Sequence, residues 1–398
     1  MFSAAVEDQD ASLFAGLERQ PPDPLLQLIG AYNDDTRQSK IDLGIGVYRD
    51  AAGLTPVMAA VKAAEGLLLR EQATKAYLGP EGDTGFLAGL KPIVLGEAAD
   101  DRWSALQTPG GTGALRLAAD LVATARPGAR IFMGTPSWAN HAPILGAGGL
   151  EIISYPCFDV ASQTLRFDVL LEALGGAAVG DVALLQVCCH NPVGADLDRR
   201  QWDDVARLMA RRRIVPLLDF PYQGLAEGLE ADAYGVRAVC AQVPEALVAY
   251  SCDKNFGLYR ERTGALFALS ANSRAAAITL SNLFALARAN WSMPPDHGAA
   301  VVRTVLEHPD LRSDWLEELE RMRSRIAEIR IALAQRDPAL AALARQHGMF
   351  STLPLSPDQI ARLRTDHGIY MAGSGRINVA GLNEANIPAF AAALAACR

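Results

Sequence analysis

The sequence predicts an α/β protein in which helices cover both faces of a mostly parallel sheet, joined to a smaller α+β domain. From about residue 105, short apolar runs alternate with segments of helical periodicity, which is the pattern of successive βαβ units. Many of these runs are apolar at every position, as expected for strands that are covered on both faces. After about residue 310 the pattern changes to one long amphipathic segment and then to short strands and helices.

The elements follow in order along the chain. Residues 1–40 are polar and proline-bearing, and they predict an arm that leads into a short helix over 25–32. An extended run with two glycines follows at 41–48, and an amphipathic helix is predicted over 57–72. The strands of the sheet are predicted at 131–134, 151–155, 182–188, 214–219, 247–250 and 265–270. Helices are predicted between them at 114–125, 167–174, 199–212 and 275–289.

The C-terminal part predicts a different layout. One long helix covers 311–335, with apolar residues at helical spacing and a charged opposite face. Short strands are predicted near 349–352, 369–372 and 376–379, and helices over 357–365 and 384–395.

Composition and charge exclude several classes of protein. The chain of 398 residues has 37 basic and 45 acidic side chains, and its net charge of −8 argues against nucleic acid as the main partner. No apolar run approaches the roughly 20 residues of a membrane helix, and no signal peptide is expected at the acidic N-terminus. Six scattered cysteines indicate reduced thiols and a cytoplasmic location. No metal site is predicted, because Cys188, Cys189 and His190 lack a second ligand pair at zinc spacing.

Polar and aromatic side chains follow four of the predicted strands at the point where each strand ends. Open α/β sheets bind ligands outside the carboxyl ends of their strands, so these loops are expected to line one crevice. The loops are residues 135–141, 190–194, 219–224 and 251–262.

The strongest single candidate for chemistry is Lys254, in the segment 249–264. This lysine follows the end of a buried strand and is flanked by aromatic residues and a glycine. A partly desolvated lysine at such a place has a lowered pKa and is a nucleophile for carbonyl compounds. Arg262, eight residues on, could bind an anion beside it. From these residues alone an ordinary surface loop is the more frequent outcome, because most lysines are solvated.

Other motifs are individually weak. The glycine-rich start of a helix at 110–114 could bind a phosphate through free backbone N–H groups, but it lacks the spacing of a dinucleotide site and the Walker lysine. Asp219, at the end of a buried strand, is either a helix cap or a carboxylate that pairs with a cation. Arg288 and Arg376 lie in apolar contexts and could hold carboxylates bidentately, although each alone is more often a surface or bridging arginine.

Taken together, the segments resemble the aspartate/aromatic aminotransferases, pyridoxal-phosphate enzymes of the class I aminotransferase family with fold type I. The resemblance covers nearly the whole chain, in order and spacing. It is carried by I-D-L-G-I-G-V-Y, T-K-A-Y-L-G, G-G-T-G-A-L-R, P-S-W-A-N-H, C-C-H-N-P-V-G, D-F-P-Y-Q-G, S-C-D-K-N-F-G-L-Y-R-E-R-T-G, R-A-N-W-S-M-P-P-D-H-G and S-G-R-I-N-V-A-G.

The resemblance implies roles for the residues around the cofactor ring. Lys254 resembles the lysine that forms the Schiff base and then moves the proton at the substrate Cα. Asp219 would pair with the pyridinium nitrogen and keep it protonated. Tyr222 and Asn191 would hydrogen-bond the 3′-oxygen, and Trp138 would stack on the ring.

The resemblance also implies a phosphate site and a substrate site shared between two subunits. The phosphate would be held by Gly111, Thr112, Ser251 and Arg262, with Tyr77 reaching in from a partner subunit. The substrate would be bound by Arg376 at its α-carboxylate and by the partner's Arg288 at a distal carboxylate, with further contributions from Gly46, Trp138, Asn191 and Ser292. A homodimer is therefore expected, with the N-terminal arm crossing to the other subunit.

The implied domains are an arm with part of the small domain over 1–50, a large cofactor-binding domain over 51–322 and the C-terminal small domain over 323–398. The implied reaction is ping-pong transamination between aspartate or an aromatic amino acid and 2-oxoglutarate. The alternatives are an aromatic-preferring aminotransferase, or β-elimination or decarboxylation with the same cofactor. A cofactor-binding regulatory protein is a further alternative, but it would need a DNA-binding segment that the acidic N-terminal region does not provide.

Three positions depart from the usual family pattern. Asp253 replaces a serine before the lysine, and a carboxylate beside a phosphate must point away or pair with an arginine. We favour an orientation away from the cofactor, because desolvating an anion there is costly. Gln186 replaces a histidine and Val193 replaces the threonine of H-N-P-T-G, and both could retune hydrogen bonds behind Asp219 and Asn191. None of the three removes a named catalytic group, so an active enzyme is expected.

Overall fold

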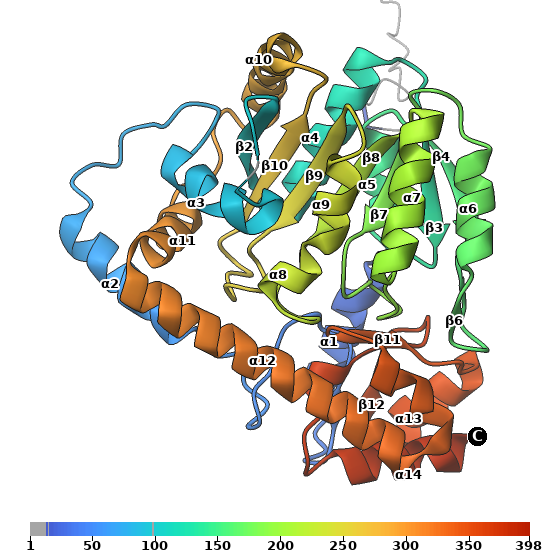
Figure 1. The fold of residues 1–398 in the computed structure, drawn as a ribbon. Helices are drawn as coiled ribbons and strands as arrows, with labels where there is room; N and C mark the ends of the chain where they lie inside the picture. Colours follow the sequence, from blue (N-terminus) through green and yellow to red (C-terminus); the bar gives the residue numbers. More distant parts are fainter. Residues whose placement is uncertain (1–12, 15, 98) are drawn as a thin grey trace, which may run out of the picture.

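The computed structural model describes residues 13–14, 16–97 and 99–398, which form an α/β architecture around a seven-stranded sheet (Figure 1). The strand order is β2-β10-β9-β8-β7-β3-β4, and within this sheet β10 alone runs antiparallel to its neighbours. Residues 1–12 of the predicted arm lie outside the described residues. The strands are β2 (Trp103–Pro109), β3 (Arg130–Thr135), β4 (Glu151–Pro156), β7 (Val182–Gln186), β8 (Val215–Phe220), β9 (Ala246–Ser251) and β10 (Thr263–Leu269).

Apolar side chains cover the sheet on both faces, as the all-apolar runs predict. One hydrophobic cluster joins one face to α4, α5 and α10, and a larger cluster joins the other face to helices that include α2, α3, α7, α9 and α12. Alternate residues of one strand divide between the two clusters. On β8, Leu217 belongs to the first cluster and Leu218 to the second, and both are fully buried.

Fourteen α-helices are assigned within the described ranges. They are α1 (Pro24–Asp34), α2 (Ala59–Glu71), α3 (Thr84–Leu95), α4 (Gly110–Ala125), α5 (His141–Ala147), α6 (Phe167–Gly175), α7 (Arg199–Arg212), α8 (Leu229–Asp232), α9 (Tyr234–Cys240), α10 (Ser273–Asn290), α11 (His297–Glu307), α12 (Pro309–Arg336), α13 (Pro357–His367) and α14 (Ile387–Cys397).

The C-terminal elements and the segment that follows α1 lie together at one end of the molecule (Figure 1). β1 (Ile41–Asp42) pairs in parallel with β12 (Ile369–Tyr370), and β11 (Phe350–Thr352) pairs antiparallel with β13 (Arg376–Asn378). The long helix α12 runs without a break from the side of α2 and α11 to this end (Figure 1). The expected boundary at 322–323 falls within α12, and the domain limits stay a prediction. A hairpin of β5 (Phe158–Asp159) and β6 (Thr164–Leu165) completes the strands of the described chain.

Some elements differ from their prediction. The sequence analysis assigned no strand to β2 and started the following helix at residue 114, whereas α4 begins at Gly110. The glycines that suggested a loop instead form the first turn of the helix, where Gly110 has a φ of 68°. The strand predicted over 182–188 ends at Gln186, because the chain turns at Cys189, which has a φ of 53°.

No helix within 13–14, 16–97 and 99–398 has the length and apolarity needed to cross a membrane. The same residues contain no cluster of His, Cys, Asp and Glu suited to a metal ion. All six cysteines lie in the described part of the chain, where they are buried and free of disulfide bonds.

Candidate active site

The candidate site lies where β7, β8 and β9 end. Asp219 on β8 is in register with Gln186 on β7 and with Ala249 on β9. Lys254 follows β9 after three residues. Because these strands are parallel, their carboxyl ends bring the loops that follow them to one edge of the sheet.

Lys254 is largely enclosed, with 20% of its side chain exposed. Its Nζ lies 3.7 Å from Asp253 Oδ2 and 5.7 Å from the centre of the Tyr222 ring. Burial lowers the pKa of Lys254, and the nearby Asp253 carboxylate opposes this shift. A primary amine that gives up its proton more easily than an exposed lysine is a better nucleophile at neutral pH.

His141 orients Asp219, and the sequence analysis gave this histidine no role. Its Nε2 lies 3.0 Å from Asp219 Oδ2, its Nδ1 lies 2.7 Å from Ser137 Oγ, and its side chain is fully buried. The ring also meets Trp138 edge to face, with 5.2 Å between ring centroids. The chain Ser137–His141–Asp219 leaves the other carboxylate oxygen free for a partner. The only sign in the sequence was the place of His141 in a loop that follows a strand.

Tyr222 and Asn191 form a second polar pair. Asn191 Nδ2 donates to Tyr222 Oη over 3.4 Å, and Asn191 Oδ1 is buried without a partner among the described residues. Burial raises the pKa of Tyr222, so its hydroxyl stays protonated at neutral pH. Gln186 fixes the backbone of Asn191 through both amide atoms, at 2.9 Å each. An unpaired buried amide oxygen is costly, which makes it a candidate ligand-binding atom.

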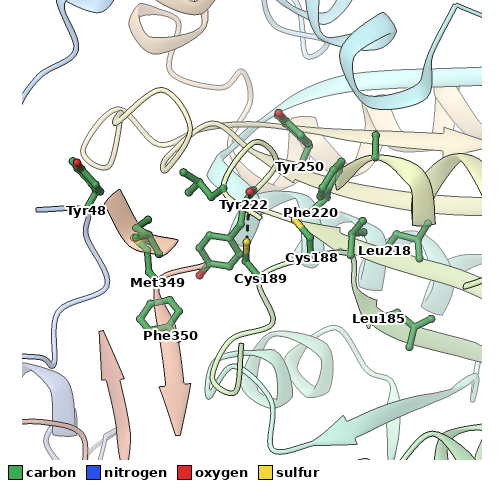
Figure 2. Close-up of a cluster of buried hydrophobic side chains, with 14 of the residues drawn as sticks. Tyr48, Leu185, Cys188, Cys189, Leu218, Phe220, Tyr222, Tyr250, Met349 and Phe350 are labelled. Carbon is green, nitrogen blue, oxygen red and sulfur yellow. Dashed lines mark hydrogen bonds between the residues drawn. The ribbon is translucent and has the colours of Figure 1, made fainter. Parts of the chain in front are cut away.

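The ring of Tyr222 also packs against the C-terminal part of the chain. It meets the Phe350 ring edge to face with 6.1 Å between centroids, and Cys189 lies beneath it (Figure 2). Gly194 permits this approach, because it has a φ of 71° and any Cβ there would collide with the Phe350 carbonyl oxygen. Val193 beside it is almost wholly buried. The buried Arg330 of α12, which the sequence analysis did not identify, donates to the carbonyls of His347, Gly348 and Phe350 and so holds this segment.

The glycines at the start of α4 form a cup with Ser251 and Arg262. A Cβ on Gly110 would lie 2.6 Å from Arg262 Nη2, and one on Gly111 would lie 3.2 Å from Ser251 Cβ. The helix begins here without a side-chain cap, so the N–H groups of its first turn, which includes Thr112, remain available. Free N–H groups, a helix N-terminus and a guanidinium together make an anion site.

The favoured orientation of Asp253 is wrong. The side chain does not turn away from this cup but pairs with Arg262, with 2.6 Å between Oδ2 and Nη1. Its backbone N–H donates to Ser251 Oγ over 3.2 Å, and only 4% of the residue is exposed. The guanidinium supplies the charge that makes burial of this carboxylate tolerable, which is the second of the two arrangements the sequence allowed.

Arg376 lies on the opposite side of Tyr222 from the sheet. Its Nη2 donates to Gly44 O over 2.7 Å, and its guanidinium lies 4.8 Å from the centre of the Phe350 ring. Its Nε is buried without a partner in the described part of the chain, and burial lowers the pKa of the side chain. Gly46 lies beside it, where a Cβ would come within 3.0 Å of the Phe350 ring. A buried guanidinium with an unused N–H is suited to a carboxylate.

Three predicted site residues lie outside this cluster. Tyr77 is 94% exposed, in the segment between α2 and α3. Arg288, at the end of α10, donates to Ser292 Oγ over 2.5 Å, and both residues are on the surface of the described chain. The structure of one chain therefore pairs Arg288 with Ser292 but does not bring either to Lys254.

The cluster fits pyridoxal phosphate on chemical grounds. Lys254 offers an amine for its aldehyde, and the cup of α4, Ser251 and Arg262 offers donors for its phosphate. Asp219 offers a carboxylate oriented by His141 for its ring nitrogen, and the unpartnered amide of Asn191 lies beside the Tyr222 hydroxyl for its ring oxygen.

Comparison with known proteins identifies the family. The profile described as "Aminotransferase class I and II" matches residues 38–394. The chain is 55% identical to a tyrosine aminotransferase of Rhizobium meliloti, over 94% of this chain and 97% of that protein. It is 42% identical to an aspartate aminotransferase of Escherichia coli, over 96% of this chain and all of that protein.

A solved structure supports the cofactor. An aromatic-amino-acid aminotransferase from Burkholderia pseudomallei, covalently bound to pyridoxal phosphate, superimposes with a TM-score of 0.94 at 40% identity, over 97% of this chain and 99% of that one. The fold type I architecture that the resemblance implied is confirmed. The chain therefore belongs to the class I and II aminotransferases, and it is a pyridoxal-phosphate-dependent aminotransferase.

Proposed function

We propose that the enzyme transfers amino groups between aspartate or an aromatic amino acid and 2-oxoglutarate in two successive half-reactions. The observation that carries the proposal is Arg376, whose buried guanidinium keeps an unpartnered Nε on the far side of Tyr222 from the sheet. All of these substrates have an α-carboxylate, and a guanidinium binds a carboxylate through two parallel hydrogen bonds. Such binding orients the substrate Cα toward Lys254.

The residues of the chain then have separate tasks. When bound, pyridoxal phosphate supplies an electron sink for the charge that develops at the substrate Cα. Lys254 is the point of attachment and takes the proton from the substrate Cα, for which its lowered pKa suits it. Asp219, oriented by His141, keeps the ring nitrogen protonated. Tyr222 and Asn191 hold the ring oxygen, and Trp138 covers the ring.

The names of relatives support both classes of amino donor. Besides the tyrosine and aspartate aminotransferases above, an aromatic-amino-acid aminotransferase of Pseudomonas aeruginosa is 45% identical over 96% of this chain and 98% of that protein. In our proposal Arg288 binds the distal carboxylate of aspartate and 2-oxoglutarate, and it leaves that position when an aromatic side chain enters.

Changing Arg288 to alanine is expected to separate the two substrate classes. The value of kcat/KM for aspartate should fall about 100-fold or more, because truncating one partner of a buried charge pair costs roughly 2–5 kcal/mol. The value for phenylalanine or tyrosine should change by less than about tenfold, since no charge is left unpaired. Steady-state kinetics with aspartate, phenylalanine and tyrosine measure the effect.

Arg274→Ala, at the other end of α10, is the control for loss of a charge from the same helix. An equal loss of activity toward aspartate and phenylalanine in Arg288→Ala would contradict the assigned role. Analysis of the products of the aspartate half-reaction separates the alternatives: transamination yields oxaloacetate and an aminated cofactor, whereas β-decarboxylation yields alanine and carbon dioxide. β-Elimination would show as release of ammonia.

We also propose that the enzyme is a homodimer with shared sites. Tyr77, Arg288 and Ser292 lie away from Lys254 in one chain, so a second chain must supply them if they act there. Large apolar side chains near Tyr77 and in the N-terminal segment are exposed in the single chain and would gain from burial. They include Leu13, Phe14, Leu17, Leu69 and Leu78.

Mixing two inactive variants is expected to restore activity if the sites are shared. In a hybrid of a Lys254→Ala chain and an Arg288→Ala chain, one of the two sites combines an intact Lys254 with an intact Arg288. Equal mixing after exchange of subunits should recover about a quarter of wild-type activity toward aspartate, because half of the dimers are hybrids with one intact site. Activity assays after unfolding and refolding of the mixture measure the recovery, and no recovery above the separate variants would contradict shared sites.

The cytoplasm is our proposed location. All six cysteines are buried and unbonded, as is usual for proteins of a reducing compartment.

A further inference from the structure

Asp253 places a buried carboxylate at the candidate phosphate site. Its Oδ2 accepts from Arg262, which lies against Gly110, and its backbone N–H donates to Ser251, which lies against Gly111. Its Oδ1 is buried and has no hydrogen-bond partner among the described residues. The carboxylate is therefore in contact with both walls of the cup and has one acceptor that lacks a donor.

The charges at this place do not balance when a phosphate dianion is bound. The cup offers one guanidinium and the partial positive charge of a helix N-terminus, which is about half an elementary charge. Asp253 already uses part of the guanidinium. Two like-charged anions in contact are strongly disfavoured, and a shared proton removes the conflict by turning repulsion into an O–H···O⁻ hydrogen bond.

We propose that the cofactor phosphate binds together with one proton from solvent, which is held between the phosphate and the Asp253 carboxyl group. The proton satisfies the open Oδ1 and lets Arg262 bridge the carboxyl and phosphate oxygens. The inference rests on the proposed phosphate site at α4, Ser251 and Arg262. Asp253 is here a residue that sets the pH dependence of cofactor binding, and it does not act on the substrate.

The other ionisable groups that face Asp253 cannot supply this proton. Arg262 remains charged at all accessible pH values. Lys254 lies 3.7 Å away, but its proton is lost or kept according to the attached group. Burial raises the pKa of the Cys252 thiol and that of Tyr259 to about 12, so both hold their protons tightly. Solvent is the remaining source.

The pH dependence follows from linkage. A free phosphate monoester loses its second proton at about pH 6, so above that pH the dianion must gain a proton to bind. The bound state then carries one proton more than the free state, and affinity falls by about tenfold for each pH unit. With Asp253→Asn the amide donates to the phosphate directly, no extra proton is needed, and this component of the slope disappears.

Calorimetry measures the proton directly. Pyridoxamine 5′-phosphate is titrated into full-length, cofactor-free Lys254→Ala protein at about pH 8, where the free phosphate is a dianion, in two buffers of different ionisation enthalpy. The same titration is made with the Lys254→Ala/Asp253→Asn protein. Removing Lys254 eliminates its titration, and the ring nitrogen with Asp219 contributes equally to both proteins. The difference in proton uptake between them isolates Asp253.

The expected difference is about one proton for each bound ligand, with a matching difference of about tenfold per pH unit in the slope of Kd. Equal proton uptake in the two proteins would overturn the proposal. Lys254→Ala/Asp253→Ser, which keeps a small donor, should behave like the asparagine variant. Lys254→Ala/Asp204→Asn, which removes a surface carboxylate on α7, should behave like the parent.

Failure of the phosphate site itself would look different. Adding Arg262→Gln to the Lys254→Ala protein should weaken binding of pyridoxamine 5′-phosphate whether or not Asp253 shares a proton. Unchanged affinity in that protein would refute the site, whereas weakened affinity with equal proton uptake would refute the role of Asp253 alone.

Discussion

Replacing Lys254 with alanine is expected to lower kcat for transamination by at least about 10⁴-fold, because a single group supplies both the attachment of the cofactor and the proton transfer. The side chain is enclosed beside Tyr222 and Asp253, and the structure places no second lysine in this cluster of described residues. The visible absorbance of the lysine-bound cofactor should also disappear. Turnover assays and absorption spectra of the purified protein with added pyridoxal phosphate measure the two effects.

The lysine on α2 provides a matched control. Lys62 is exposed and pairs with Glu65, so Lys62→Ala should keep both turnover and spectrum. Near-normal turnover in Lys254→Ala would refute the assignment. Exogenous methylamine is a further check, because a small amine that enters the space of the missing side chain should restore part of the proton transfer.

Elements with strong local signals were predictable from the sequence. The helix predicted over 199–212 has these bounds in α7, because Asp198 and Gln201 form a capping box and the helix is strongly amphipathic. Strands that end in a polar residue were also located well: Asp219 and Lys254 were correctly placed at the carboxyl end of the sheet. Local patterns identify these features since the causes of each lie within a few residues of it.

Features that depend on contacts between distant segments were not predictable in the same way. His141 acts on Asp219, 78 positions away, and a lone histidine has no local pattern that reveals this. Arg330 is buried on α12 by carbonyl groups of residues 347–350, although arginine is rarely buried. Strand β2 is covered by the antiparallel β10, a pairing between segments about 160 residues apart in the chain.

Asp253 shows how one ion pair decides between two orientations. The cost of desolvating a carboxylate favoured an outward side chain, and that cost is real. Arg262 offsets it, but the 2.6 Å pair requires the turn at residues 257–262 and a φ of 52° at Arg262, neither of which the sequence pattern indicated. The motif alone placed both residues near one phosphate, and only the fold places them against each other.

Changing Arg376 to lysine is expected to lower kcat/KM for every amino acid and oxo acid substrate by about 10²–10³-fold, since truncating one partner of a buried charged pair costs roughly 2–5 kcal/mol. Lysine keeps the charge but cannot bind a carboxylate through two parallel hydrogen bonds, and it loses the contact with the Phe350 ring. The effect should be equal for aspartate, phenylalanine and 2-oxoglutarate, in contrast to that of Arg288→Ala, because all three share the α-carboxylate. Initial rates over a range of each substrate measure it.

The outcome for Arg376→Lys distinguishes binding of the α-carboxylate from a purely structural role. Arg376 Nη2 also donates to Gly44 O, so part of the effect could arise from a displaced segment 41–48. A structural loss would lower the thermal midpoint and weaken cofactor binding along with activity. Loss of carboxylate binding would leave both unchanged and would spare slow reaction with amines that have no carboxylate. Arg321→Lys, at an exposed pair on α12, controls for the substitution itself. Selective loss for dicarboxylates in Arg376→Lys would reassign this arginine to the distal carboxylate and Arg288 to another role.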